Sequence, residues 1–278
     1  MTILAPESVE EACDLLARHP DLVPMAGGTD LLVHWPQNLE AHGRSYLDLS
    51  RIEELKPHRW TEDALVLGGL TTYWDVLRDE RARKELPLLL DAGRQVGAVQ
   101  IQTRGTWAGN IVNASPAADG VPVLMAYDAE VELISASGTE TVALADFYLG
   151  YKEMRRRADQ LIRSIRLPRR AYDVQVFHKV GSRRAQAIAK VGLAITHSAA
   201  GWRVVAASMA PTVRRCPALE RMLEDGVAVG GPEDFLPAIR EDVSPIDDIR
   251  STARYRERVM ARVLFYTLQP GPGVASHS

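Results

Sequence analysis

The sequence contains few cysteines: only Cys13 and Cys216 occur among its 278 residues. Two thiols are too few for a four-cysteine zinc site or iron–sulfur cluster, and they give no disulfide framework. This cysteine content is typical of the reducing cytoplasm, where we expect the protein to reside. Cys13 falls on the apolar face of a predicted helix and is expected in the core. Cys216 is either structural or, beside Arg214 and Arg215, reactive.

Long apolar runs and an excess of charge of one sign are also missing. No stretch approaches the roughly 18 apolar residues that a transmembrane helix requires. The first seven residues lack the basic and apolar regions of a signal peptide. The 33 Lys and Arg residues nearly balance the 36 Asp and Glu residues, giving a formal charge of −3. Nothing in this balance favours nucleic acid or an anionic membrane as a partner.

Several common site motifs are absent. No Gly-x-Gly-x-x-Gly follows a predicted strand, and no Walker loop or Gly-x-Ser-x-Gly elbow occurs. The seven histidines show no metal-ligand spacing, so we expect each to be a surface or packed residue. A Rossmann dinucleotide site, a P-loop, a serine hydrolase and a histidine-bound metal therefore have no support.

The apolar patterning predicts short strands and helices in irregular order. Predicted helices cover residues 8–19, 75–84, 87–98, 217–225 and 252–268, and the first is N-capped by Ser8. Predicted strands cover 22–26, 46–49, 64–68, 130–135, 139–142, 159–167, 174–180, 185–198 and 202–211. Without a regular βαβ alternation, this order is typical of an α+β fold. A linker at Pro168-Arg169-Arg170 predicts two domains.

A first glycine-rich segment follows the predicted strand at 22–26. It reads Met25, Ala26, Gly27, Gly28, Thr29, Asp30 and Leu31. Paired glycines permit positive φ and let backbone N–H groups converge on an anion. The segment is therefore either an anion-binding loop or an ordinary tight turn in which Thr29 or Asp30 is an N-cap.

A second segment, residues 103–119, is a predicted loop that gathers hydrogen-bonding side chains among small residues. Its candidate ligand-binding residues are Thr106, Trp107, Ala108, Gly109, Asn110, Asn113, Ser115 and Asp119. Hydroxyls, amides and a carboxylate suit the phosphate oxygens and ribityl hydroxyls of a flavin nucleotide, and small residues allow close approach. The alternative is a polar Ω-loop with no ligand. Two such segments without a Rossmann motif favour a flavin site of another kind.

The chain resembles the FAD-binding (medium) subunits of the molybdenum hydroxylases, such as carbon monoxide dehydrogenase and bacterial xanthine dehydrogenase. The resemblance rests on Ala-Gly-Gly-Thr-Asp at 26–30, Thr-x-x-Gly-Asn at 106–110 and Ser-Pro-Ala-Ala-Asp at 115–119. It continues through Leu-Gly-Gly-Leu-Thr-Thr at 67–72 and Phe-His-Lys-Val-Gly-Ser-Arg-Arg at 177–184.

The resemblance implies a fold as well. Residues 1–170 would form a two-lobed FAD-binding domain of the vanillyl-alcohol-oxidase (PCMH) type. Residues 172–270 would form a small flavoprotein C-terminal domain built on a three-stranded antiparallel sheet, and residues 271–278 a mobile tail.

The function implied is that of an FAD-carrying electron-transfer subunit in an oxidoreductase complex. An iron–sulfur small subunit with two [2Fe–2S] clusters would supply electrons from a molybdopterin large subunit, within a dimer of heterotrimers. The external acceptor would be NAD⁺, a quinone, a cytochrome or O₂. A stand-alone FAD-dependent oxidase and a non-redox FAD-binding regulatory module are the alternatives.

The resemblance also assigns roles to residues. The first segment would wrap the FAD pyrophosphate, and Thr106 to Asn110 would contact the phosphate and ribityl region. Asn113, Ser115 and Asp119 would add hydrogen bonds, and Lys179 would lie near the isoalloxazine. No catalytic acid or base and no metal ligand is assigned. Trp107 departs from the family's aliphatic residue, so it either packs on the cofactor or fills the core.

Overall fold

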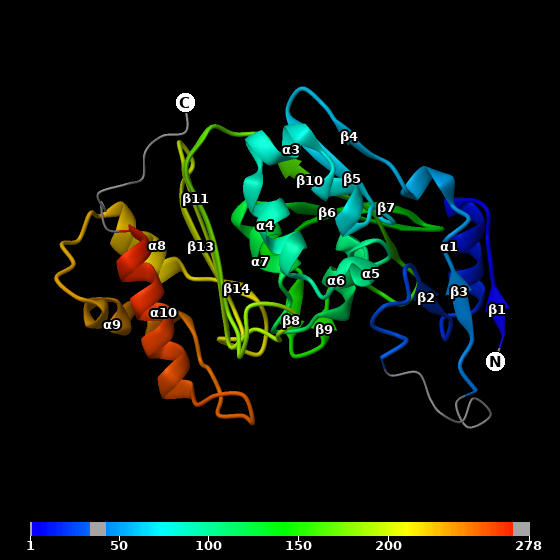
Figure 1. The fold of residues 1–278 in the computed structure, drawn as a ribbon. Helices are drawn as coiled ribbons and strands as arrows, with labels where there is room; N and C mark the ends of the chain where they lie inside the picture. Colours follow the sequence, from blue (N-terminus) through cyan, green and yellow to red (C-terminus); the bar gives the residue numbers. More distant parts are fainter. Residues whose placement is uncertain (1, 34–42, 269–278) are drawn as a thin grey trace.

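The computed structural model describes residues 2–33 and 43–268, as a mixture of helices and strands (Figure 1). The helices are α1 Val9–Arg18, α2 Tyr73–Leu77, α3 Glu80–Glu85, α4 Pro87–Gln95, α5 Val99–Gln102, α6 Trp107–Asn113, α7 Gly120–Ala126, α8 Pro217–Glu224, α9 Leu236–Asp242 and α10 Ala253–Leu268. The predicted tail at 271–278, and residues 269 and 270 of the predicted second domain, lie outside the described residues.

The strands form four sheets. They are β1 Ile3–Leu4, β2 Val23–Met25, β3 Tyr46–Asp48, β4 His58–Trp60, β5 Ala64–Gly68, β6 Glu130–Ser135, β7 Gly138–Ala143, β8 Tyr148–Gly150, β9 Glu153–Met154, β10 Leu161–Pro168, β11 Tyr172–Val180, β12 Val191–Ser198, β13 Gly201–Ala207 and β14 Arg214–Arg215. Their orders are β1-β3-β2, β4-β5-β10-β6-β7, β8-β9 and β11-β12-β13-β14.

A small N-terminal unit consists of α1 and the parallel sheet β1-β3-β2. The side chain of Ser8 accepts a hydrogen bond from the Glu11 N–H at 3.1 Å, so the predicted N-cap is confirmed. The apolar face of α1 buries Ala12, Cys13 and Leu16 in a separate hydrophobic cluster. Strand β2 leads out of this unit directly into the first glycine-rich segment.

The largest hydrophobic cluster continues beyond the predicted linker. Helix α7 is buried along its whole length and contacts both β12 and β13. Ala194, Val205 and Ala207 from these strands belong to the same cluster as Trp107 and the five-stranded sheet. The C-terminal part is therefore packed firmly against the preceding part through a shared core.

The C-terminal sheet differs from the expectation of three strands. A fourth strand, β14, pairs antiparallel with β13 through Val205 and Arg215. It is only two residues long and carries two arginines, so no apolar alternation marks it in the sequence. Strand β12 also begins at Val191 rather than at residue 185.

One predicted helix is divided. The stretch 75–84 contains the end of α2 and the start of α3, with Asp79 between them. The Asp79 carboxylate accepts hydrogen bonds from the N–H groups of Arg81 and Ala82, and so caps α3. A side chain that binds the backbone of the following residues favours a new helix start over a continuous helix.

Candidate functional site

A cavity of about 540 Å³ lies between the two segments that the sequence singles out, and we call it the glycine pocket. The first segment lines it with Ala26, Gly27, Gly28, Thr29, Asp30 and Leu31. The second segment lines it with Thr106, Ala108, Gly109, Asn110 and Asn113. Met25 is partly buried beside the cavity without lining it. Most residues predicted for a nucleotide site thus converge on one cavity.

The two glycines of the first segment serve different purposes. A Cβ at Gly27 would overlap the backbone carbonyl oxygen of Arg104, because the two segments touch at this point. Arg104 Nε also donates a hydrogen bond to the Gly27 carbonyl at 3.2 Å. A Cβ at Gly28 would make only ordinary van der Waals contacts, but the φ of +71° favours glycine. Gly27 allows the two segments to approach each other closely, and Gly28 allows the chain to turn.

The second segment contains a helix, α6, in contrast to the loop expected from its polar residues. Thr106 is the N-cap of α6, and its Oγ accepts a hydrogen bond from the Gly109 N–H at 2.9 Å. Asn110 Oδ1 accepts a hydrogen bond from the Gly120 N–H at 3.2 Å. These side-chain oxygens thus have partners within the chain, and their main visible role is to hold the segment in place.

Backbone contacts fix the second segment against the turn after β5. The Trp107 N–H donates to the Thr71 carbonyl at 3.2 Å, and the Tyr73 N–H donates to the Gly105 carbonyl at 3.1 Å. At the opposite end, Asn113 Nδ2 donates to Asp30 Oδ1 at 2.8 Å. The pocket is therefore closed by direct bonds between segments that lie about eighty residues apart in the sequence.

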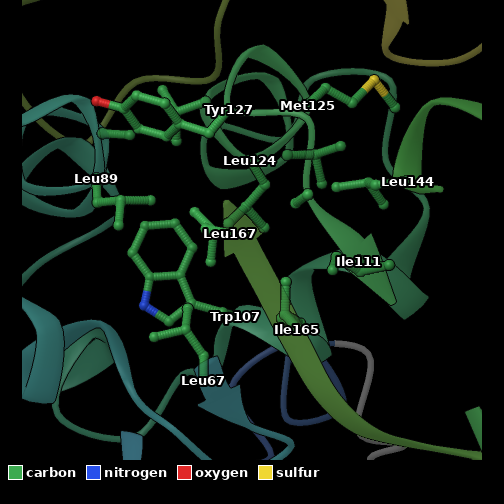
Figure 2. Close-up of a cluster of buried hydrophobic side chains, with 14 of the residues drawn as sticks. Leu67, Leu89, Trp107, Ile111, Leu124, Met125, Tyr127, Leu144, Ile165 and Leu167 are labelled. Carbon is green, nitrogen blue, oxygen red and sulfur yellow. The ribbon is translucent and has the colours of Figure 1, made fainter. Parts of the chain in front are cut away.

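The Trp107 side chain lies in the core and does not line the glycine pocket. Figure 2 shows its indole among Leu67, Leu89 and Leu167, and none of it is exposed. Its ring centroid lies 4.7 Å from that of Tyr73. This position corrects the expectation that Trp107 contacts the cofactor with its indole: of the two roles considered from the sequence, the structure favours the packing role.

The remaining predicted residues line a second cavity, of about 770 Å³, which we call the interdomain pocket. Ser115, Asp119 and Lys179 all belong to its wall. Two short stretches of chain contribute to the walls of both pockets. Val96 lines the glycine pocket while Gly97 lines the interdomain pocket, and Asn113 and Ser115 are divided in the same way.

A buried ion pair lies in the wall of the interdomain pocket. Lys179 Nζ donates to Asp119 Oδ2 at 2.5 Å and to the Gln95 carbonyl at 2.9 Å. The two side chains are only 7% and 15% exposed. Burial raises the pKa of Asp119 to about 6, although Lys179 acts in the opposite direction. Lys179 is thus a cation fixed in place by one carboxylate and one backbone carbonyl.

Two polar atoms beside the glycine pocket are buried without a hydrogen-bond partner among the described residues. They are the Tyr73 hydroxyl and Arg156 Nε, and both residues line the pocket. Buried polar groups are normally hydrogen-bonded, so unpaired ones at a cavity indicate groups that await a polar ligand. Together with the close approach at Gly27, these atoms fit a flavin nucleotide. Sequence reasoning missed both residues because neither lies in a glycine-rich segment.

The cysteines and histidines provide no further site within the described chain. Cys13 and Cys216 are free and buried, and burial raises the pKa of the Cys216 thiol. A structural role is thereby favoured for Cys216 over a reactive one. Residues 2–33 and 43–268 contain no group of His, Cys, Asp and Glu that could hold a metal ion. No helix in these ranges is long and apolar enough to cross a membrane.

Family comparisons match both parts of the chain. Residues 1–170 match the FAD binding domain in molybdopterin dehydrogenase, and residues 176–270 match the CO dehydrogenase flavoprotein C-terminal domain. The nicotinate dehydrogenase FAD-subunit of Eubacterium barkeri is 30% identical over 267 residues, which cover 91% of this chain and 90% of that protein. The carbon monoxide dehydrogenase medium chain of Hydrogenophaga pseudoflava is 28% identical, with 94% and 93% covered.

A solved structure gives the same result for the fold. Carbon monoxide dehydrogenase from Hydrogenophaga pseudoflava, in a form lacking the Mo-pyranopterin moiety, has a chain that superposes with a TM-score of 0.81. That chain is 26% identical, and the match covers 94% of this chain and 93% of that one. The chain therefore belongs to the family of FAD-binding medium subunits of the molybdenum hydroxylases.

Proposed function

We propose that one FAD extends from the glycine pocket to the interdomain pocket of this chain. The observation that carries the proposal is that two stretches of chain, residues 96–97 and 113–115, contribute to the walls of both cavities. An elongated ligand can place its ADP half in the first cavity and its isoalloxazine near the second. The turn at Gly27 and Gly28 suits a pyrophosphate, because the positive φ of Gly28 lets successive backbone N–H groups converge on an anion.

The residues around the proposed isoalloxazine end suit a reduced flavin. FAD supplies one-electron uptake together with one- or two-electron delivery. Lys179 would place a positive charge beside the N1–C2=O edge, where negative charge develops on reduction. Asp119 and the Gln95 carbonyl would hold the ammonium group in this position. Ser115 would contribute a hydroxyl from the adjoining turn. No residue of the chain is required as a catalytic acid or base.

The architecture supports the finer fold assignment that we propose. The unit of α1 and β1-β3-β2 has a separate hydrophobic cluster, and the five-stranded sheet belongs to another. This arrangement agrees with two lobes of the vanillyl-alcohol-oxidase (PCMH) type within residues 1–170. Residues 172–270 would then be the flavoprotein C-terminal domain, which completes the interdomain pocket through Lys179 and residues 186–189.

The assembly would be that of the family. We propose an iron–sulfur small subunit and a molybdopterin large subunit as partners, arranged as a dimer of heterotrimers. The chain would pass electrons from the [2Fe–2S] clusters to NAD⁺, a quinone, a cytochrome or O₂. The two free, buried thiols agree with a cytoplasmic location. The substrate pocket of the complex would lie in the large subunit.

The test is to purify the chain alone and with its partner subunits. We expect one FAD per chain, all of it released by acid precipitation. We also expect the flavin absorbance to bleach under anaerobic conditions only when the reduced iron–sulfur subunit is present. Turnover of a reducing substrate by the lone chain would instead identify a stand-alone oxidase. Bound FAD that the reduced iron–sulfur subunit fails to bleach would identify a non-redox binding module.

A further inference from the structure

Only one nitrogen of the Arg156 guanidinium, Nη1, donates hydrogen bonds to the described chain. The residue lies in the turn between β9 and β10, is partly buried and lines the glycine pocket. Nη1 donates to the carbonyl of Arg157 at 3.0 Å and to that of Gln160 at 2.6 Å. Nε is buried and has no acceptor among the described residues. The two carbonyls fix the guanidinium plane and leave its Nε–Nη2 edge without a protein partner.

The guanidinium of Arg156 also makes no direct ion pair among the described residues. Its neighbour Arg157 pairs with Asp159 at 3.0 Å, whereas no carboxylate in the described chain lies within ion-pair distance of Arg156. Burial lowers the pKa of Arg156, although Asp159 acts in the opposite direction without pairing with it. A partly buried guanidinium without an anion is costly for folding, so an anion from outside the chain is the natural compensation.

The composition of the pocket wall indicates which anion this is. Among the described residues, the charged side chains that line the glycine pocket are Asp30 and Arg156. Asp30 is exposed and accepts a hydrogen bond from Asn113 at the edge of the pocket. Arg156 is therefore the cation in the described wall of the pocket, while the exposed Arg104 lies beside it and donates to the Gly27 carbonyl. The Nε–Nη2 edge of an arginine matches two oxygens of one phosphate in a bidentate pair.

We propose that Arg156 binds a phosphate of the ADP half of FAD through its Nε–Nη2 edge. The proposal rests on the proposed placement of FAD and adds to it a residue that selects for the phosphorylated dinucleotide. Gln160 contributes by orientation: its carbonyl accepts from Nη1, and its side chain is held by Glu140 and by the Arg157 N–H. The β9–β10 turn thus becomes a third binding segment beside the two glycine-bearing ones.

Binding measurements on FAD-free protein test this assignment. The probes are FAD, ADP and adenosine, with affinities measured by calorimetry for the wild type, R156M and R156K. We expect R156M to weaken ADP and FAD binding by about ten- to a hundredfold and to leave adenosine unchanged. R156K should retain part of the affinity, because it keeps a charge and loses the bidentate geometry. R155M is the matched control: it removes an exposed arginine from the same turn and should bind all three as the wild type does.

Three results would overturn the assignment. Unchanged ADP affinity in R156M would show that Arg156 only stabilises the turn and does not bind the phosphate. An equal loss of adenosine and ADP would mean contact with the base rather than with a phosphate. Equal affinities in R156K and R156M would show that the positive charge does not contribute to binding. If R156M folds poorly, R156K provides the comparison with the wild type. A wild type that binds none of the probes would contradict the proposed FAD site itself, which is a separate failure.

Discussion

The two segments that face each other across the glycine pocket are built on different principles. Residues 25–31 form a turn whose path depends on missing side chains, since Gly27 touches the Arg104 backbone and Gly28 has positive φ. Residues 106–119 contain a helix that is held by its own side chains and by Trp107 in the core. Changes in the first segment should therefore affect cofactor binding most, and changes in the second should affect the fold most.

Gly27→Ala should have the largest effect on the cofactor. The added Cβ would overlap the Arg104 carbonyl oxygen, so the two segments would have to separate and the pocket would open. We expect FAD content to fall from one per chain to less than about a tenth, measured by absorbance after gel filtration. Gly28→Ala is the matched control, with strain of about 1–2 kcal/mol and no overlap. It should weaken FAD binding by no more than about thirtyfold. Full FAD content in Gly27→Ala would show that the close contact does not matter.

Trp107→Ile should have the largest effect on stability. A fully buried indole is replaced by a smaller side chain, and the loss should be about 2–4 kcal/mol, somewhat less than for truncation to alanine. Denaturant unfolding gives the stability, and emission of bound FAD should not change. Trp74→Ile, at a site that is 36% exposed, is the control and should cost much less. A rise in FAD emission with unchanged stability would show that Trp107 contacts the cofactor.

Thr106→Ala should show a smaller loss of the same kind. It removes the oxygen that caps α6 through the Gly109 N–H, which costs about 1 kcal/mol at a typical N-cap. FAD affinity should stay within about threefold of the wild type once the protein is folded. Thr106→Ser keeps the hydroxyl and should restore the stability. If Thr106→Ala keeps its stability but loses FAD, the hydroxyl binds the cofactor rather than the helix.

Asp119→Asn should change how stability depends on pH. Burial raises the folded-state pKa of Asp119 from 3.8 to about 6, so the folded state binds this proton more tightly than the unfolded state. The contribution of Asp119 to the free energy of unfolding is then full below about pH 4 and is lost as the pH rises to about 6. The asparagine of the variant does not titrate, so the variant does not lose this contribution. Its free energy of unfolding, relative to that of the wild type, should therefore rise between pH 4 and pH 6. A constant difference across this range would contradict the raised pKa.

The sequence predicts those parts of the fold that have a local signal. Strand β5 occupies the predicted residues 64–68, and α1 begins at the predicted cap. Helix α7 was not predicted because it is buried on all sides, so it has no polar face and no helical periodicity. The sequence predicts a loop where α6 lies, because Asn110 and Asn113 are typical of ligand-binding loops. In the structure, Asn110 and Asn113 hydrogen-bond to the chain itself.

The sequence predicts the type of ligand better than it predicts the positions of the binding residues. The glycines and the family motifs identify a flavin nucleotide, since their spacing is local to each segment. The division of the predicted residues between two cavities depends on how α7 packs against β12 and β13, which is a long-range contact. Tyr73 and Arg156 enter the pocket from segments with ordinary composition. Only their unpaired buried atoms distinguish them, and these become visible in the folded chain.

Hydrogen exchange with and without FAD tests the central claim most directly, which is that the two segments enclose the ADP half of the cofactor. The account predicts that adding FAD to FAD-free protein slows amide exchange most at residues 26–31 and 105–113, with smaller protection near Lys179. ADP alone should protect the first two regions and leave Lys179 unaffected. Protection by FAD that is confined to the C-terminal sheet, with none at Gly27 or Gly109, would contradict it.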